Sequence, residues 1–369
     1  MAHVIREVDD PRSWEAFFAV PQAVYGGDPR YLVPFRDAEL ESLRRPEFAG
    51  RQRLLVAVDG TRRIARLAAR LSPALRDDGG RPFGLLGFFE ARDDPPAVGA
   101  LFREAVSWLK DRGAGPIVGP MDGDTWHRYR LNVGPWGEPP FLMEPYNPPY
   151  YPALWEANGF RVLEQYLSKR LDDVAGVAAR FEPRYRAALA AGYRFEPLRR
   201  DRFADELRRL YRLSCEIFRD NRLYSEISEE RFLGIYAGFR RLADPDFVTF
   251  AVAPDGSDAG FLFGFPDRFR AVAALGGRKG PVAALRFLWA RRSPVDTVNL
   301  KSLGVVPAHR RSHLASALMA CGYRAAREKG LARVNLCLIL GGNPSGRLDA
   351  GLGQVLRRYH LYQLGEAAP

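Results

Sequence analysis

The sequence has 369 residues, of which 47% are hydrophobic and 27% charged, and its formal net charge is +11. At roughly 100–200 residues per domain this length predicts about two domains, and the composition excludes long-range disorder and collagen-like repeats. No stretch approaches about 18 uninterrupted apolar residues, and the first residues lack the apolar core of a signal peptide. We therefore expect a cytoplasmic protein with no membrane partner. Three widely separated cysteines predict free thiols, with no zinc site.

The first half alternates strand and helix patterns in an order typical of mixed α/β domains. The apolar run at 53–58 precedes the hairpin signal Asp59-Gly60, and the run GLLGFFE at 84–90 suits a central strand. Residues 97–112 carry apolar side chains at helical spacing. In chain order we expect strands at 3–8, 53–58, 64–71, 84–90, 117–120 and 160–171, and helices from about 13, at 97–112 and at 150–157.

The second half repeats this order, which predicts a duplicated α/β unit with a boundary close to 172–193. A helix at 174–191 would connect the two copies. The second half is further predicted to contain a basic, helical insert at 268–292. We expect its strands at 193–197, 247–253, 259–265, 295–306, 332–340 and 355–363, and its helices at 202–218, 228–240, 310–329 and near Asn343.

The strongest signal for chemistry lies at 303–326, where a strand ends in Val305-Val306-Pro307 and a short loop opens into an amphipathic helix. The unpaired N–H groups and the dipole at a helix start favour an anion, especially a pyrophosphate. Arg310 and Arg311 add positive charge, and Ser312 adds a hydroxyl that can cap the helix.

This segment resembles the signature of the GNAT superfamily of acyl-CoA-dependent N-acetyltransferases, in which V-x-P is followed by Q/R-x-x-G-x-G/A. Arg310 occupies the Q/R position and Ala315 the last small position, whereas His313 stands where the family has its first glycine. The resemblance implies acetyl-CoA or another acyl-CoA as co-substrate and no metal. The implied cofactor-binding residues are Val305, Val306, Arg310, Arg311, Ser312, His313, Leu314 and Ala315, with Asn343 and Ser345 from the helix that the family opens with asparagine.

The first half resembles a GNAT domain that has lost its cofactor. The segment 146–160 looks like the family's asparagine, helix and "GF" ending, but Asp93 and Asp94 follow the central strand and would repel a diphosphate. The whole chain also resembles a group of uncharacterised bacterial tandem-GNAT proteins. We therefore expect a mixed sheet with flanking helices in two tandem GNAT-like domains. They comprise a degenerate domain at 1–172, a connecting helix at 173–193 and an acyl-CoA-binding domain at 194–369.

The sequence identifies the catalytic residues less clearly than the cofactor-binding residues. Family members often carry a tyrosine that protonates the leaving thiolate, but Ala350 holds that position here, which leaves Tyr359 as a substitute. An amine acceptor must lose a proton to a base. Glu226 and Tyr224, between the two helices of the second half, are our candidates. Glu90 and the aspartates that follow it are expected in a solvated turn.

The sequence thus predicts an acyltransferase that moves an acetyl or other acyl group from CoA to an amine of a small molecule or peptide, as a monomer or homodimer. Three alternatives stay open. They are a tRNA-dependent aminoacyltransferase of tandem-GNAT type, a non-catalytic acyl-CoA-binding or scaffold protein, and an acyl-CoA enzyme of different chemistry such as a decarboxylase. Only five basic residues are lysines, and the 50 arginines are scattered. We therefore interpret the charge as an arginine-rich background rather than a nucleic-acid surface.

Overall fold

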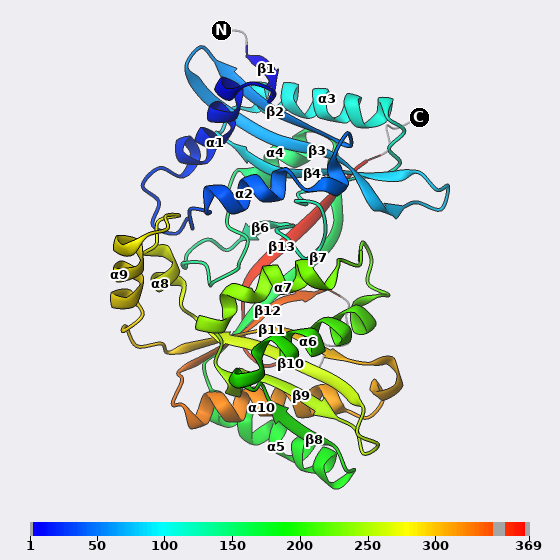
Figure 1. The fold of residues 1–369 in the computed structure, drawn as a ribbon, viewed down its shortest axis with the longest axis vertical. Helices are drawn as coiled ribbons and strands as arrows, with labels where there is room; N and C mark the ends of the chain where they lie inside the picture. Colours follow the sequence, from blue (N-terminus) through cyan, green and yellow to red (C-terminus); the bar gives the residue numbers. More distant parts are fainter. Residues whose placement is uncertain (1–2, 342–350, 366–369) are drawn as a thin grey trace. The chain divides into compact units, whose positions relative to one another are not determined.

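The computed structural model describes residues 3–341 and 351–365. It divides into unit 1 (Met1–Gln165, Arg270–Ala290 and Tyr359–Pro369) and unit 2 (Tyr166–Phe269 and Arg291–Arg358). Each unit contains a mixed sheet flanked by helices (Figure 1), so the predicted α/β fold class is confirmed. Within the part of the chain that is described, no helix is both long and apolar enough to cross a membrane.

Unit 1 is built on the sheet order β1-β2-β3-β4-β5-β13, in which β13 is Gln354–Leu364. β4 and β5 are parallel, and the other neighbours of known register are antiparallel. Its strands are β1 (Val4–Glu7), β2 (Gln52–Asp59), β3 (Arg62–Arg76), β4 (Pro82–Ala91), β5 (Ile117–Gly119) and β6 (Leu131–Gly134). Its helices are α1 (Pro11–Tyr25), α2 (Arg36–Leu43), α3 (Pro95–Asp111) and α4 (Tyr151–Ala157), with a 3-10 turn η1 (Pro46–Phe48).

Helices cover both faces of the unit 1 sheet, which explains why β2 reads as a continuous apolar run. Leu54 and Val56 pack in one cluster with Phe17 of α1. Leu55 and Ala57 pack in a second cluster with the apolar face of α3. Because successive side chains of a strand point to opposite faces, a strand covered on both sides needs apolar residues at every position.

Two arginines of β3 are fully buried. Arg66 donates to the Glu39 carboxylate at 2.7 Å, and Arg70 donates to the backbone oxygen of Asp122 at 2.9 Å. The guanidinium of Arg70 also lies 4.3 Å from the ring centre of Phe48. Burial lowers the pKa of Arg70 to about 10, which leaves it protonated at neutral pH. Part of the arginine content is therefore used inside unit 1 and does not contribute to a charged surface.

Unit 2 is built on the sheet order β8-β9-β10-β11-β12-β7, in which β7 is Phe160–Leu171 and, among the described strands, only β11 and β12 are parallel. Helices α5 and α10 share an apolar cluster with one face of the sheet, and α6 packs on β10 and β11. The strands are β8 (Arg194–Pro197), β9 (Val248–Val252), β10 (Asp258–Pro266), β11 (Thr297–Val305) and β12 (Arg333–Leu340). The helices are α5 (Val174–Ala190), α6 (Phe203–Phe218), α7 (Glu229–Ala237) and α10 (Leu314–Glu328), with turns η2 (Arg200–Arg202), η3 (Gly238–Arg241), η4 (Pro245–Phe247) and η5 (Pro307–His309).

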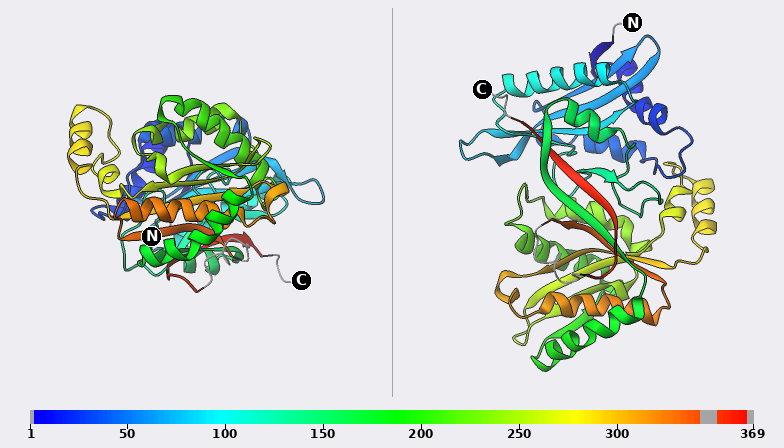
Figure 2. Two further views of the ribbon diagram at one scale, coloured as in Figure 1. Left: turned by 90° about the horizontal axis from the view of Figure 1, so that it is seen from below. Right: turned by 180° about the vertical axis from the view of Figure 1, so that it is seen from behind.

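The two halves of the chain exchange their last strands, β7 (Phe160–Leu171) and β13 (Gln354–Leu364), which are drawn in green and red in Figure 2. β7 follows the first-half elements but pairs with β12, from Leu171 opposite Val334 to Tyr166 opposite Leu340. β13 ends the second half but pairs with β5, with Tyr362 opposite Gly119. Each exchanged strand supplies backbone partners to a sheet edge that would otherwise be open. The compact units therefore do not follow chain order at these two strands.

The described elements lie close to their predicted ranges, with a few differences. α2 and β6 were not predicted. The expected insert at 268–292 contains α8 (Phe269–Ala273) and α9 (Pro281–Ala290), and most of it is assigned to unit 1. The helix expected at 310–329 begins at Leu314, because the residues before it form η5 and a loop. The helix expected near Asn343 lies outside the described residues.

Candidate functional site

Strands β11 and β12 of unit 2 pair in parallel and then diverge. Their last pair is Leu300 with Leu336. β12 shifts its register against β7 before Ile339, whereas β11 stays paired with β10 as far as Val305. After Leu300, the backbone of β11 is therefore not paired with β12.

A buried asparagine pair lies just before this divergence. Asn299 and Asn335 stand opposite each other, and the Asn335 Nδ2 donates to the Asn299 Oδ1 at 2.9 Å. The remaining amide atoms, the Asn299 Nδ2 and the Asn335 Oδ1, are buried and have no hydrogen-bond partner in the part of the chain that the structure describes. Asn299 is the cross-strand neighbour of Phe265, and the ring of Phe265 contacts Phe239 of η3. The asparagine pair therefore lies on the face of the sheet that η3 covers. Because an unsatisfied buried polar atom costs about 1–3 kcal/mol, this pair suits a ligand that both donates and accepts.

The loop between β11 and α10 presents backbone donors. The N–H of Val306 already donates to the Ala259 oxygen at 3.0 Å. Within the described residues, no acceptor is recorded for the backbone N–H groups of Arg311, His313, Leu314 and Ala315. We name residues 310–315, which are the end of this loop and the first two residues of α10, the α10 loop. N–H groups at a helix start form an anion site, which the helix dipole reinforces.

Three polar side chains of the α10 loop have distinct positions. Arg310 Nη2 donates to the Ile217 carbonyl at 3.2 Å, so Arg310 ties the loop to the end of α6. Arg311 is exposed. Ser312 Oγ donates to the His309 carbonyl at 2.6 Å and therefore does not cap α10. Leu314 is buried in the unit 2 core and anchors the first turn of the helix.

His313 has the backbone conformation for which glycine is ordinarily used. Its φ is 57° and its ψ is 16°, and its side chain makes no capping hydrogen bond to α10. The side chain is exposed. His313 therefore keeps the left-handed turn that glycine forms in the family, and histidine tolerates this conformation better than most residues do.

Tyr224 and Glu226, the predicted catalytic pair, lie in the loop between α6 and α7. Burial raises the pKa of Tyr224 well above its ordinary value, and the Cys215 thiol and the Glu226 carboxylate add to the shift. Tyr224 therefore keeps its proton at neutral pH. Glu226 is exposed. Ile217 lies in the last turn of α6, just before this loop, and packs so tightly on β11 that a Cβ at Gly304 would lie 2.6 Å from its side chain.

The other predicted residues lie elsewhere. Tyr359 belongs to unit 1, is fully buried and donates its hydroxyl proton to Glu144. Asn343 and Ser345 lie outside the described residues. In the ranges 3–341 and 351–365, no cluster of three or more His, Cys, Asp or Glu side chains could hold a metal ion.

Unit 1 has a helix start equivalent to that of α10, at α3, but its donors are removed or already paired. Pro95 and Pro96 have no N–H, and the Ala97 N–H donates to the Asp94 carboxylate at 3.2 Å. The same carboxylate lies 3.3 Å from the His3 Nε2. An aspartate of the chain thus occupies the position where an external anion would bind.

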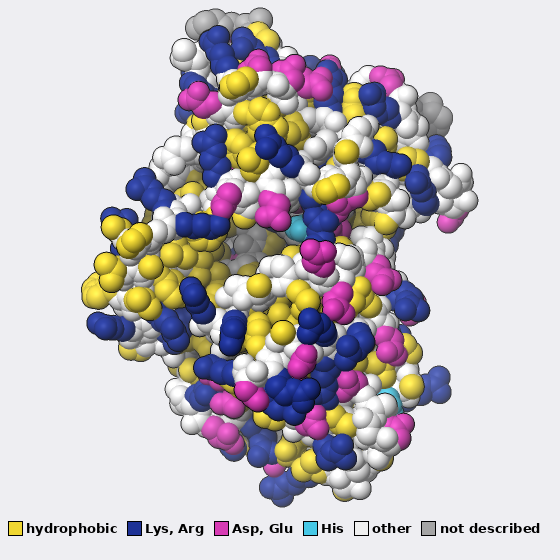
Figure 3. All heavy atoms as spheres, in the orientation of Figure 1, with side chains coloured by type: hydrophobic (Ala, Val, Ile, Leu, Met, Phe, Trp, Pro, Cys, Tyr) yellow, Lys and Arg dark blue, Asp and Glu magenta, His cyan; other side chains and the backbone are white. Residues whose placement is uncertain are grey.

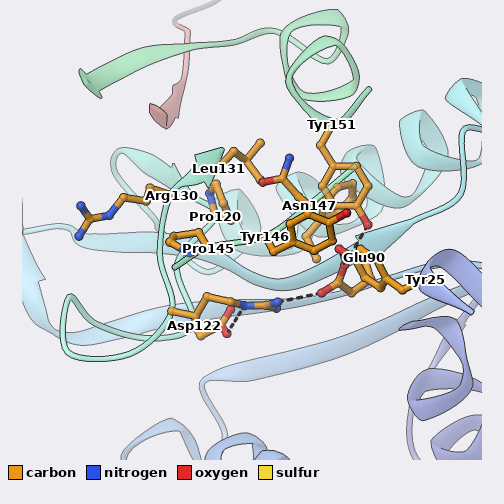
Figure 4. Close-up of a pocket in the computed structure, with 12 residues that line it drawn as sticks. Tyr25, Glu90, Pro120, Asp122, Arg130, Leu131, Pro145, Tyr146, Asn147 and Tyr151 are labelled. Atoms are coloured by element: carbon orange, nitrogen blue, oxygen red, sulfur yellow. Dashed lines mark hydrogen bonds and ion pairs between the residues drawn. The ribbon is translucent and has the colours of Figure 1, made fainter. Parts of the chain in front are cut away.

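Unit 1 contains a pocket built around Glu90 at the end of β4 (Figure 4), with an empty volume of about 310 Å³ that is partly open to solvent. Glu90 is only 1% exposed and accepts hydrogen bonds from the Tyr25 hydroxyl at 2.6 Å, the Tyr151 hydroxyl at 2.9 Å and Arg128 at 2.8 Å. Arg128 also bonds Asp122 at 3.2 Å. Figure 4 shows Glu90 grouped with the two tyrosines at one end of the pocket and Asp122 at the other.

The solvated turn expected at Glu90 is therefore wrong. Burial, followed by the charge of Glu90, raises the pKa of both Tyr25 and Tyr151 well above its ordinary value, so both hydroxyls stay protonated as donors. The apolar run before Glu90 was the only sequence signal for its burial. Its three donors use much of its accepting capacity, so we assign this cluster to holding the pocket together.

The comparisons with known proteins agree with this geometry. Residues 207–348 match the model of the Acetyltransferase (GNAT) family. The match begins in α6 and includes the divergent strands and the α10 loop. The second half of the chain is therefore similar to the GNAT family over these residues, which agrees with the resemblance found in the sequence.

Similar whole chains were also found. The chain is 24% identical over 304 residues to the bacterial ceramide synthase of Caulobacter vibrioides, covering 81% of this chain and 79% of that one. It is 24% identical over 378 residues to protein YghO of Escherichia coli, covering 98% and 95%. Among solved structures, a GCN5-related glucosamine N-acetyltransferase region of a fungal multi-domain β-N-acetylglucosaminidase aligns with a TM-score of 0.55 and 15% identity. That alignment covers 98% of this chain but 38% of the fungal chain, and it supports the fold alone.

Proposed function

We propose that this protein is an N-acyltransferase that uses acyl-CoA, and that unit 2 binds the cofactor at the α10 loop. One observation carries the proposal: four backbone N–H groups that find no acceptor among the described residues lie in the loop of Arg310 and Arg311, where β11 has separated from β12. At α3 of unit 1, Asp94 and two prolines fill or remove the equivalent donors. We therefore place a single cofactor site in the chain, in unit 2.

The residues present fit the chemistry of CoA. The N–H groups of the α10 loop and the exposed Arg311 would hold the diphosphate, because both favour negative charge. The edge of β11 that faces away from β10, beyond its last pair with β12 at Leu300, would bind the amide-bearing arm of the cofactor. When bound, CoA supplies the acyl group as a thioester. The chain's task is to position the acceptor amine and to remove its proton.

The proposed roles at the acceptor follow from burial and protonation. Glu226 is an exposed carboxylate and would accept the amine proton. Tyr224 keeps its proton, so it would donate a hydrogen bond rather than act as a base. The unpartnered amide atoms of Asn299 and Asn335 would orient the acceptor. We assign no catalytic role to Tyr359, because its hydroxyl already donates to Glu144 within unit 1.

Calorimetric titration of the full chain with acetyl-CoA and longer acyl-CoAs tests the cofactor site. We expect binding by the native protein and a loss of about tenfold or more in affinity for Arg311→Ala, since a hydrogen bond to a charged group contributes roughly 1.5–3 kcal/mol. Arg310→Ala should weaken binding as well, because it also releases the loop from Ile217. Arg186→Ala is the matched control, because Arg186 is an exposed arginine on α5.

The outcomes separate the alternatives. No detectable binding at millimolar acyl-CoA would refute the cofactor assignment, and unchanged binding by both loop variants would place the cofactor elsewhere. Binding without release of free CoA in the presence of varied amines would favour the non-catalytic protein. Strongly salt-dependent binding of aminoacyl-tRNA, without acyl-CoA binding, would favour the tRNA-dependent enzyme.

A second candidate narrows the acceptor to a lipid amine and the donor to a long-chain acyl-CoA. The specific observation is the 24% identity to the chain named bacterial ceramide synthase, which extends over 81% of this protein. Acyl transfer from palmitoyl-CoA to a long-chain amino alcohol, compared with transfer from acetyl-CoA to short amines and peptides, tests it. Faster transfer to the short amines would exclude the lipid acceptor.

A further inference from the structure

Helix α9 exposes an unusual concentration of apolar side chains. Nine large hydrophobic side chains are exposed among the described residues, and four of them belong to this ten-residue helix. Their exposed fractions are 63% for Val282, 66% for Leu285, 52% for Leu288 and 76% for Trp289. Single exposed hydrophobic residues need no explanation, but a cluster on one helix indicates an interaction surface.

The exposed residues share one face, and the opposite face is anchored. Positions 282, 285 and 289 follow the i, i+3, i+7 spacing of one side of a helix, and 288 lies beside them. On the other side Ala283 is buried. The turn that leads into α9 contacts another part of unit 1, where Lys279 forms an ion pair with Asp37. The apolar face is therefore held outward.

Positive charge surrounds this face. Residues 267–292 contain seven basic residues and one acidic residue. The basic residues are Arg268, Arg270, Arg278, Lys279, Arg286, Arg291 and Arg292. Figure 3 shows hydrophobic side chains gathered over α8 and α9 with Lys and Arg side chains at the margin.

We propose that α9 docks this protein on the surface of an anionic lipid bilayer. A ten-residue helix is about 15 Å long, too short to span a bilayer but long enough to lie within its interface. Tryptophan favours that interface, and surrounding cations are attracted by anionic headgroups. A second copy of the chain fits less well, because two such patches would bring their basic margins together. This proposal departs from the expectation, drawn from the sequence, that the protein has no membrane partner.

Vesicle co-sedimentation of the full chain tests the proposal. We expect binding to vesicles that contain 30% phosphatidylglycerol in phosphatidylcholine, weaker binding at higher salt, and little binding to phosphatidylcholine alone. The double substitution Leu285→Ser/Trp289→Ser should lower the partition coefficient about a hundredfold by removing apolar surface. The pair Arg278→Gln/Arg286→Gln should lower it about thirtyfold, at roughly tenfold per 1.4 kcal/mol and 1 kcal/mol per cation.

Leu189→Ser is the matched control, because Leu189 is 44% exposed on α5, which is not part of the basic insert. It should bind vesicles as the native protein does. Absence of native binding to anionic vesicles would overturn the proposal, as would native-like binding by the Leu285→Ser/Trp289→Ser variant. Equal binding to neutral vesicles would refute the role of the basic margin. Sedimentation equilibrium tests whether α9 instead binds a second copy of the chain. Self-association of the native protein that is lost in the Leu285→Ser/Trp289→Ser variant, together with no binding to vesicles, would identify that second copy as the partner.

Discussion

The conformation of His313 yields a prediction that tests the α10 loop directly. A left-handed backbone costs an L-residue about 1–2 kcal/mol. Glycine avoids this cost, but it loses more conformational entropy on folding than other residues do, which costs about 0.5–1 kcal/mol. At the observed φ of 57° these two effects nearly cancel for His313→Gly, so we expect its free energy of unfolding to stay within about 1 kcal/mol of the native value. His313→Val should lose about 1 kcal/mol or more, because a β-branched residue tolerates this conformation poorly.

Urea unfolding followed by circular dichroism measures these changes, and acetyl-CoA titration measures their effect on the site. We expect His313→Gly to bind the cofactor as the native protein does, because the backbone N–H is retained. Gly330→Val is the control: Gly330 has φ +64° at the far end of α10, so it should lose similar stability without losing binding. Native stability of His313→Val would contradict the left-handed turn. A loss of binding in His313→Gly greater than tenfold would show that the imidazole itself contacts the cofactor.

Three further predictions concern unit 1. Glu90→Gln should lower the free energy of unfolding by about 2 kcal/mol in a denaturant titration, since the buried Glu90 carboxylate is the anionic partner of Arg128, and an unchanged midpoint would contradict the assigned role. Asp94→Ala should cost about 1 kcal/mol by removing the cap of α3, yet create no acyl-CoA site in an Arg311→Ala background. Burial raises the pKa of Asp28, but hydrogen bonds led by Arg30 outweigh it and lower the pKa to about 2 from 3.8. A lowered carboxylate pKa stabilises the fold above pH 3.8, and this contribution is lost as pH falls through about 2. Asp28→Asn should therefore flatten the decline of melting temperature over that range.

Local sequence patterns were sufficient for the order of elements and for the loop that carries the proposed chemistry. The apolar run at 53–58, the helical spacing at 97–112 and the junction at 303–326 each depend on neighbours in the chain, and each corresponds to a described element. Hydrophobic periodicity reports such local order because a strand or helix buries its own faces. The family's strand, loop and helix signature was readable for the same reason.

The tertiary structure decided which polar groups are already hydrogen-bonded within the chain and which can bind a ligand. Whether the Val306 N–H is free depends on Ala259, a residue of another strand. Glu90 is likewise already hydrogen-bonded, by donors that lie far from it along the chain. The unpartnered amides of Asn299 and Asn335 also became visible only when two strands were placed side by side.

The sequence by itself therefore determined the repeated α/β order and the loop proposed to bind an anion in the second half, because both are properties of short, contiguous segments. Only the tertiary structure decided the exchange of β7 and β13 between the sheets and the outward face of α9. Strand pairing and burial depend on residues distant in sequence. The pattern 281–290 reads equally well as a buried helix until its surroundings are known.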